Sequence, residues 1–294
     1  MFLQLVGNGL VTGSVIAIAA VGVSLVYGIL GLVNFAFGDV MAFGGFVAFL
    51  FNVTLGLPIA AATAIAMLMT ALLCVVLEGV LWRPLRLRRA GFMSLFLASI
   101  GLALVLRQAI FLVAGPQTRA FDVDPYRVYV VASVRFSTGQ TAALVVATAT
   151  IVLVGLVLGL TSVGRTMRAV ADSRTLAAVA GIDTERVVVL TWVLAGLLAA
   201  LAGVLAGLVQ SSFDPNFGFS LLLPTFAAVV LGGIGSAYGA LAGGIALGLA
   251  MEVSTWSGFF GGVDSVYKPV VAFAVLIVAL LLRPQGLLGK ARLA

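Results

Sequence analysis

The sequence has little of what soluble proteins and metalloenzymes depend on. Only 9% of its 294 residues are charged and 63% are hydrophobic, whereas a soluble domain usually carries about 25% charged residues. There is no histidine, which removes the commonest proton shuttle and metal ligand. The single cysteine, Cys74, excludes a disulfide framework and a cysteine-rich metal site. These absences disfavour a soluble enzyme, a nucleic-acid binder and a secreted domain, and leave a polytopic membrane protein.

Long hydrophobic stretches make up most of the chain. They lie at about 5–30, 36–51, 58–82, 92–113, 140–161, 187–210, 221–256 and 266–282, and one span needs roughly 20 mostly apolar residues. The stretch 221–256 is too long for one crossing, and the glycines of Gly232–Ser236 interrupt it, because an interior glycine costs about 1 kcal/mol relative to alanine. The pattern predicts an all-α polytopic membrane protein. We expect one transmembrane domain over 1–294, with about 8 transmembrane helices plus a broken or half-helix near 221–236.

Basic residues are absent before Arg83, so the first apolar segment lacks the positive region of a signal peptide and is expected to stay in the mature protein. They then gather in three short segments, which the positive-inside rule places in the cytoplasm. These segments are 83–89, 165–186 and 283–292. Alternation puts the mixed-charge loop 114–139 outside. We therefore expect a location in the cytoplasmic (inner) membrane, with the N-terminus outside and the C-terminus in the cytoplasm. This distribution is typical of membrane orientation and not of a nucleic-acid footprint.

Two interruptions of the apolar pattern stand in similar places in the two halves of the chain. They are 31–39, which contains Asn34 and Asp39, and 231–239, which contains Gly235 and Ser236. Paired interruptions of this kind are the best sequence pointer to a central substrate path in a transporter. The four named residues are therefore the predicted lining of that path.

Few ionisable residues lie inside or at the edges of the apolar stretches: Asp39, Glu78, Arg107 and Glu252. An ionisable group at membrane depth is a functional hypothesis by default, because its burial is costly. For Glu78, Arg107 and Glu252 the plainer interpretation is a helix end or a subunit interface. Glycines spaced by four, such as Gly9/Gly13 and Gly244/Gly248, favour close packing of helices.

The loop 161–186 combines apolar and charged residues at helical spacing. Residues 165–180 are expected to form a short helix, with Gly181 as its stop signal. A structured helix between two spans is what a soluble partner could grip. The chain has no G-x-x-x-x-G-K-[ST] phosphate loop, so it is not expected to hydrolyse ATP itself.

Three segments resemble the membrane permease subunits of branched-chain amino-acid ABC importers. The first, 31–45 (GLVNFAFGDVMAFGG), is similar to that family's "NFAHGE…GAY" signature. The second is the loop 164–183, which looks like the family's ATPase-contacting loop. The third is 228–244 (AVVLGGIGSAYGALAGG), followed by 282–289 (LRPQGLLG). Phe37 replaces the family's histidine and Asp39 its usual glutamate, so a role tied to that histidine does not carry over.

The resemblance implies a transport subunit that is not itself an enzyme. Its partners would be two cytoplasmic ATP-binding subunits, a second permease subunit (homologous or identical) and an extracytoplasmic substrate-binding protein. The ATP-binding subunits would use the ATP, and no cofactor or metal is expected on this chain. They would grip the coupling residues Gly164, Arg165, Met167, Arg168, Ala169, Asp172 and Gly181.

Other functions stay open at this point. Urea or short amides are alternative solutes within the same family, because the binding protein does most of the selecting. An autonomous channel or an ion-coupled carrier is the alternative from another class, and it would need buried charges that pair within this one chain. A membrane-embedded enzyme is disfavoured by the lack of histidine and of an acidic cluster within a span.

Overall fold

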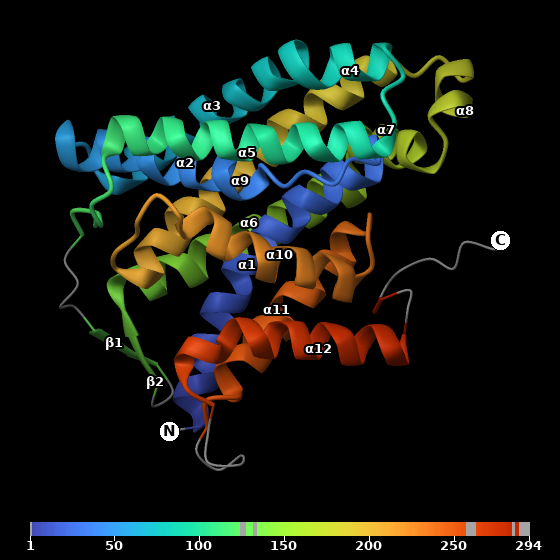
Figure 1. The fold of residues 1–294 in the computed structure, drawn as a ribbon. Coiled ribbons are helices and arrows are strands. Elements are labelled where there is room, and N and C mark those ends of the chain that lie inside the picture. Colours follow the sequence, from blue (N-terminus) through green and yellow to red (C-terminus); the bar gives the residue numbers. More distant parts are fainter. Residues whose placement is uncertain (1, 124–127, 132–133, 257–262, 284–285, 288–294) are drawn as a thin grey trace.

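The computed structural model describes residues 2–123, 128–131, 134–256, 263–283 and 286–287. Helices account for most of these residues (Figure 1). They are α1 (Phe2–Leu30), α2 (Phe37–Phe49, continued by η1, Leu50–Thr54), α3 (Ile59–Leu77, continued by η2, Glu78–Trp82), α4 (Arg83–Leu87), α5 (Phe92–Ala114), α6 (Thr138–Leu160), α7 (Ser162–Asp172), α8 (Arg174–Val179), α9 (Thr184–Gln210), α10 (Phe217–Gly232), α11 (Ala237–Val253), η3 (Ser265–Tyr267) and α12 (Lys268–Leu282). The two strands are β1 (Val128–Val131) and β2 (Val134–Ser137).

The helices confirm an all-α polytopic membrane protein. Within the described residues, 7 continuous helical segments are long and apolar enough to cross a bilayer, and each coincides with a stretch expected from the sequence. The expected broken stretch is the pair α10 and α11, two shorter apolar helices of 16 and 17 residues. The predicted count of about eight spans and a half-helix therefore corresponds to seven long helices and this pair.

The break between α10 and α11 reverses the chain. Gly233 and Gly235 adopt φ angles of +104° and +84°, a region that glycine enters without steric cost. The Ser236 hydroxyl then accepts a hydrogen bond of 3.0 Å from the Gly239 amide and caps α11. Gly232 lies directly against the carbonyl of Gly239. The two helices thus form a tight antiparallel hairpin instead of one long crossing.

The core is centred on α1, which packs antiparallel to α11. Gly9 and Gly13 of α1 face Gly244 and Gly248 of α11, and a Cβ atom added to Gly13 would lie 3.0 Å from the Ile245 Cα atom. Small residues at this spacing let two backbones approach closely. The spacing of four residues in the sequence predicted this packing correctly.

The other predicted interruption begins where α1 ends. Gly31 has φ +63°, and residues 31–36 run non-helically into the protein, with Leu32, Asn34 and Ala36 buried, before α2 begins. A Cβ atom added to Gly28 would lie 3.3 Å from the Gly235 carbonyl oxygen. The end of α1 and the α10–α11 turn, far apart in the sequence, are therefore neighbours.

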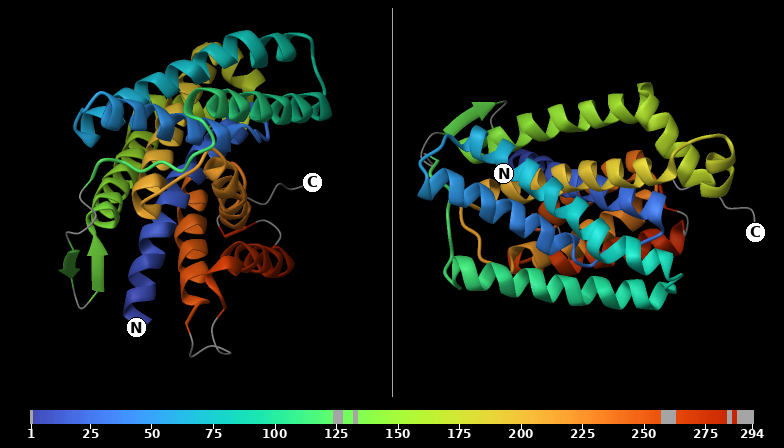
Figure 2. Two further views of the ribbon diagram at one scale, coloured as in Figure 1. Left: turned by 60° about the vertical axis from the view of Figure 1, so that its left-hand side comes forward. Right: turned by 90° about the horizontal axis from the view of Figure 1, so that it is seen from above.

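The molecule has two distinct ends (Figure 2). At one end the Gln4 side chain donates a hydrogen bond of 2.7 Å to the Arg135 carbonyl, which ties α1 to the β1–β2 hairpin. This hairpin, with Val128 opposite Ser137, is an antiparallel element that the sequence did not predict. At the opposite end lie α4, α7, α8 and the start of α9, together with the end of α12. The described basic residues of all three segments lie at this same end. Lys290 and Arg292, in the third segment, lie outside the described residues.

The expected helix over 165–180 is wrong in one respect, because the structure divides it into α7 and α8. Ser173 is extended, with φ −158° and ψ 109°. Its hydroxyl accepts a hydrogen bond of 3.3 Å from the Leu176 amide and starts a new helix. Serine competes with helical backbone bonding in this way. Gly181 ends α8 with φ +84°, as predicted.

Candidate functional site

A buried ion pair joins the first turn of α2 to α5. The Asp39 carboxylate is 0% exposed and the Arg107 side chain is 16% exposed. Arg107 Nε donates to Asp39 Oδ1 at 2.9 Å and Nη2 donates to Oδ2 at 3.1 Å, a bidentate geometry. The N-terminal position in α2 also favours the negative charge. Of the ionisable residues named from the sequence, Asp39 and Arg107 are thus partners of each other.

The ion pair lies beneath the surface between α5 and α10. The Arg107 guanidinium carbon lies 4.6 Å from the ring centre of Phe219 in α10, a cation–π contact. Phe219 is itself 42% exposed. Arg107 stands about two helical turns before the end of α5, within its apolar length. A partly exposed guanidinium at that depth is costly against lipid, so this face is suited to a protein partner or an aqueous path.

An aromatic cluster lies further along the same two helices. Phe35, in the segment before α2, packs against Phe96 of α5 and Phe226 of α10, with ring centres 5.2 and 5.1 Å apart. All three rings are half-buried. The Phe35 amide also donates to the Ser99 hydroxyl at 3.3 Å, which fixes the segment against α5. The sequence alone does not group these residues, because they come from three distant segments.

The other predicted path residues have local roles that the structure makes visible. The Asn34 side chain is buried and its Oδ1 accepts a hydrogen bond of 3.1 Å from the Ala36 amide, which shapes the turn into α2. Gly235 is exposed in the α10–α11 turn, and the half-buried Ser236 caps α11. Phe37, at the position of the family's histidine, is buried against Gly22 of α1.

The α7–α8 pair presents a surface at the end of the molecule. Gly164, Met167 and Val170 form the buried face of α7, whereas Arg165 and Asp172 are exposed and Ala169 is half-buried. The exposed Arg168 donates to the Leu158 carbonyl, so its guanidinium also fixes the end of α6. On α8, Leu176 and Val179 are 70% and 83% exposed. The residues predicted from the sequence for this contact lie on α7 and at Gly181, and Leu176 was not among them.

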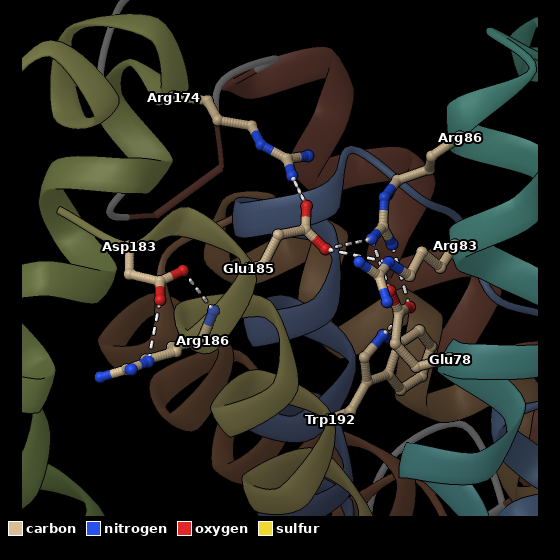
Figure 3. A network of polar contacts seen from close by, with 8 residues as sticks. All are labelled: Glu78, Arg83, Arg86, Arg174, Asp183, Glu185, Arg186 and Trp192. Atoms are coloured by element: carbon tan, nitrogen blue, oxygen red, sulfur yellow. Dashed lines mark hydrogen bonds and ion pairs between the residues drawn. The ribbon is translucent and has the colours of Figure 1, made fainter.

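A network of charges fastens this end together (Figure 3). Glu185, in the first turn of α9, accepts from Arg174 of α8 at 2.6 Å and lies 3.7 Å from both Arg83 and Arg86. Arg86 also donates two hydrogen bonds, of 2.9 and 2.5 Å, to the carboxylate of the buried Glu78. The network thereby links α8 and α9 to the α3–α4 segment.

The indole of Trp192 completes the environment of Glu78. Its Nε1 donates to Glu78 Oε2 at 2.6 Å, and its ring stacks on Trp82 with centres 6.0 Å apart. Glu78 is therefore a fully paired structural group. It lies at the junction of α3 and η2, buried among partners from this same chain.

We expect Glu78→Gln to lower stability far more than Glu185→Gln. Removing one member of a buried ion pair costs about 3–5 kcal/mol, and we expect about 3 kcal/mol, at the low end, because Arg86 retains the nearby Glu185. Glu185 is 48% exposed, and pairs at such sites contribute about 0–1 kcal/mol. Thermal unfolding of the two purified variants measures both effects. Equal losses would contradict the assignment of Glu78 as the buried centre of the network.

A further ion pair lies near the N-terminal half of α1. Lys268 Nζ lies 2.8 Å from Glu252 Oε1, and the Thr12 hydroxyl donates to the same oxygen at 3.3 Å. Glu252 thus has its partner at a helix junction, between α11 and the start of α12. Glu252 was a candidate from the sequence, whereas its partner Lys268 was not.

These features define a class: a multi-pass helical membrane protein, with an ion pair beneath the α5–α10 face and exposed apolar residues on α8 at one end. Residues 5–280 match the family described as the permease component of the branched-chain amino acid transport system. The chain belongs to this family.

Relatives named as branched-chain amino acid permeases align with nearly the whole chain. It is 33% identical over 302 aligned residues to the high-affinity branched-chain amino acid transport system permease protein LivH of Escherichia coli K12, covering 98% of this chain and 96% of LivH. The corresponding protein BraD of Pseudomonas aeruginosa is also 33% identical, with the same coverage. The probable branched-chain amino acid transport permease protein LivH of Methanocaldococcus jannaschii is 27% identical over 96% of this chain and 91% of its own.

A solved structure shares the fold. PsaBC from Streptococcus pneumoniae, in complex with Fab, aligns with a TM-score of 0.52 over 97% of this chain and 93% of its own, at 16% sequence identity. At this identity the likeness concerns the fold alone.

Proposed function

We propose that this chain is the transmembrane permease subunit of an ATP-driven importer that moves branched-chain or other apolar amino acids across the cytoplasmic membrane. The observation that carries the proposal is the family match over residues 5–280, together with relatives at 33% identity that are named as permeases for these solutes. The buried ion pair and the aromatic cluster of the α5–α10 face suit a solute with a charged backbone and an apolar side chain. Asn34, Asp39, Gly235 and Ser236 are proposed to line its path.

The α7–α8 pair is proposed as the contact with the ATP-binding partners. Its outer surface combines exposed apolar residues of α8 with the arginines of α7, a composition suited to a protein interface. Two ATP-binding subunits, a second permease subunit and an extracytoplasmic substrate-binding protein would complete the importer. ATP would be hydrolysed by the partners, since this sequence contains no phosphate loop. No cofactor is proposed on the permease itself.

The orientation of the chain in the membrane is inferred from the end of the molecule where the arginines lie. The described arginines of the three basic segments gather where α4, α7 and α8 lie, and arginine-rich ends face the cytoplasm. The N-terminus and the β1–β2 hairpin are therefore proposed to face outward, and the C-terminus inward. This arrangement puts α7 and α8 on the side where ATP is available.

Copurification of the tagged chain from its own membranes in mild detergent tests the proposal. We expect two ATPases that carry phosphate loops and a second permease subunit. A chain that comes out alone, and that moves leucine into liposomes without ATP, would overturn the proposal in favour of a channel or an ion-coupled carrier.

A further inference from the structure

In the Asp39–Arg107 pair, the Asp39 carboxylate is engaged by Arg107, whereas Arg107 has donors to spare. Both carboxylate oxygens of Asp39 are occupied by Arg107, and Asp39 is fully buried behind it. A guanidinium has five N–H donors, and Asp39 takes one from Nε and one from Nη2. Among the described residues no other acceptor bonds Arg107, so both N–H groups of Nη1 remain available. Arg107, whose side chain is 16% exposed, therefore keeps unused N–H donors beside the partly exposed Phe219.

We propose that this pair is the recognition point for the zwitterionic head of the transported amino acid. The solute's α-carboxylate first binds the free edge of Arg107. As the guanidinium turns toward this new partner, the α-ammonium takes its place on Asp39. The four charges then alternate in sign around one ring, and the inference rests on the proposed function.

The cost of opening the pair makes the site selective. Separating a carboxylate from a guanidinium inside an apolar protein leaves two uncompensated charges. A zwitterion compensates both at once, because it carries one group of each sign. Urea and short amides compensate neither, and a solute with one charge compensates only one. The pair thus favours amino acids over the amide solutes that the sequence alone left open.

The aromatic cluster supplies the second half of the recognition. Phe35, Phe96 and Phe226 lie along the same two helices and stay partly exposed. They offer apolar contact to a side chain while the head group is held at Asp39 and Arg107. The ion pair suits the charged head group of a zwitterion, and the neighbouring aromatic rings suit its aliphatic side chain.

Leucine uptake by the complete importer in proteoliposomes tests the pair directly. Asp39→Asn and Arg107→Gln are expected to lower ATP-dependent uptake by at least about tenfold, the factor associated with losing a hydrogen bond to a charged group. Both variants should retain their ATP-binding partners. Glu252→Gln removes a charge from the Glu252–Lys268 pair, which lies off this face, and is expected to keep most of the uptake.

A thiol at Phe219 tests the same site with the pair intact, should the charge variants fold poorly. The native Cys74 is buried, so Phe219→Cys provides the reactive thiol for a charged reagent. We expect faster labelling than for Val152→Cys on α6, which lies on the opposite side of the molecule from α5 (Figure 2). Leucine at ten times its half-saturating concentration should slow the labelling about tenfold by mass action, whereas urea and leucinamide should not.

The outcomes separate this inference from the proposed function. Unmodified importer that shows no ATP-dependent leucine uptake overturns the proposed function. Normal uptake by the unmodified importer together with normal uptake by folded Asp39→Asn overturns the inference alone. So does labelling at Phe219→Cys that urea slows as strongly as leucine.

Discussion

Replacing Gly248 by leucine is expected to prevent the chain from reaching its folded state. A side chain at this position would point directly into the backbone of Gly13, at the closest approach of α1 and α11. Overpacking usually costs about 1–3 kcal/mol when neighbouring side chains can move. Here the obstacle is main chain in the most buried helix of the protein, so we expect a larger loss.

Size-exclusion profiles and thermal unfolding of the purified protein measure this effect. Gly101→Leu is the matched control, because no atom lies within 4 Å of a Cβ atom added to Gly101 in α5. The control should give a monodisperse protein of normal stability. If Gly248→Leu behaved like the control, the proposed antiparallel contact of α1 with α11 would be wrong.

Placing aspartates at Leu176 and Val179 is expected to release the ATP-binding partners. These side chains are 70% and 83% exposed on α8, and α8 projects beyond the long helices (Figure 1). A charge buried in an interface without a partner costs several kcal/mol. Together the substitutions should abolish copurification of the ATPases.

The membrane core should be untouched by this change. The double variant is expected to unfold at the same temperature as the unmodified chain, since neither residue belongs to the core. Leu55→Asp, at a site that is 60% exposed near the opposite end, should keep the ATPases bound. Retention of the ATPases by the α8 double variant would refute the assignment of α7–α8 as the coupling surface.

Local signals in the sequence were sufficient for the spans and for both chain breaks. Apolar length predicted the long helices, and the glycines of 232–236 predicted the α10–α11 turn, because glycine supplies the positive φ angles that the turn requires. The same local view overlooked Ser173, whose capping hydroxyl divides the expected helix into α7 and α8. Helix propensity over 165–180 favours continuity, and one side-chain hydrogen bond was enough to overcome it.

The pairing of the buried charges depended on tertiary structure. Asp39 and Arg107 are 68 positions apart, and Glu78 and Trp192 are 114 apart. No local pattern specifies which of the buried ionisable groups meet. The sequence therefore indicated Asp39 and Arg107 as separate candidates, whereas their pairing, Phe219 and the Phe35–Phe96–Phe226 cluster required the packing of α2, α5 and α10.

Leucine uptake into proteoliposomes that contain the purified importer, measured with and without ATP on the side of the ATPase subunits, shows whether this chain works as the permease of an ATP-driven importer. The substrate-binding protein is supplied on the side of the membrane opposite the ATPase subunits. We then predict uptake that requires ATP hydrolysis and that stops when Leu176→Asp and Val179→Asp disrupt the α8 surface. Uptake that proceeds equally without ATP, or that needs only this chain, would contradict its assignment as the permease subunit of an ATP-driven importer.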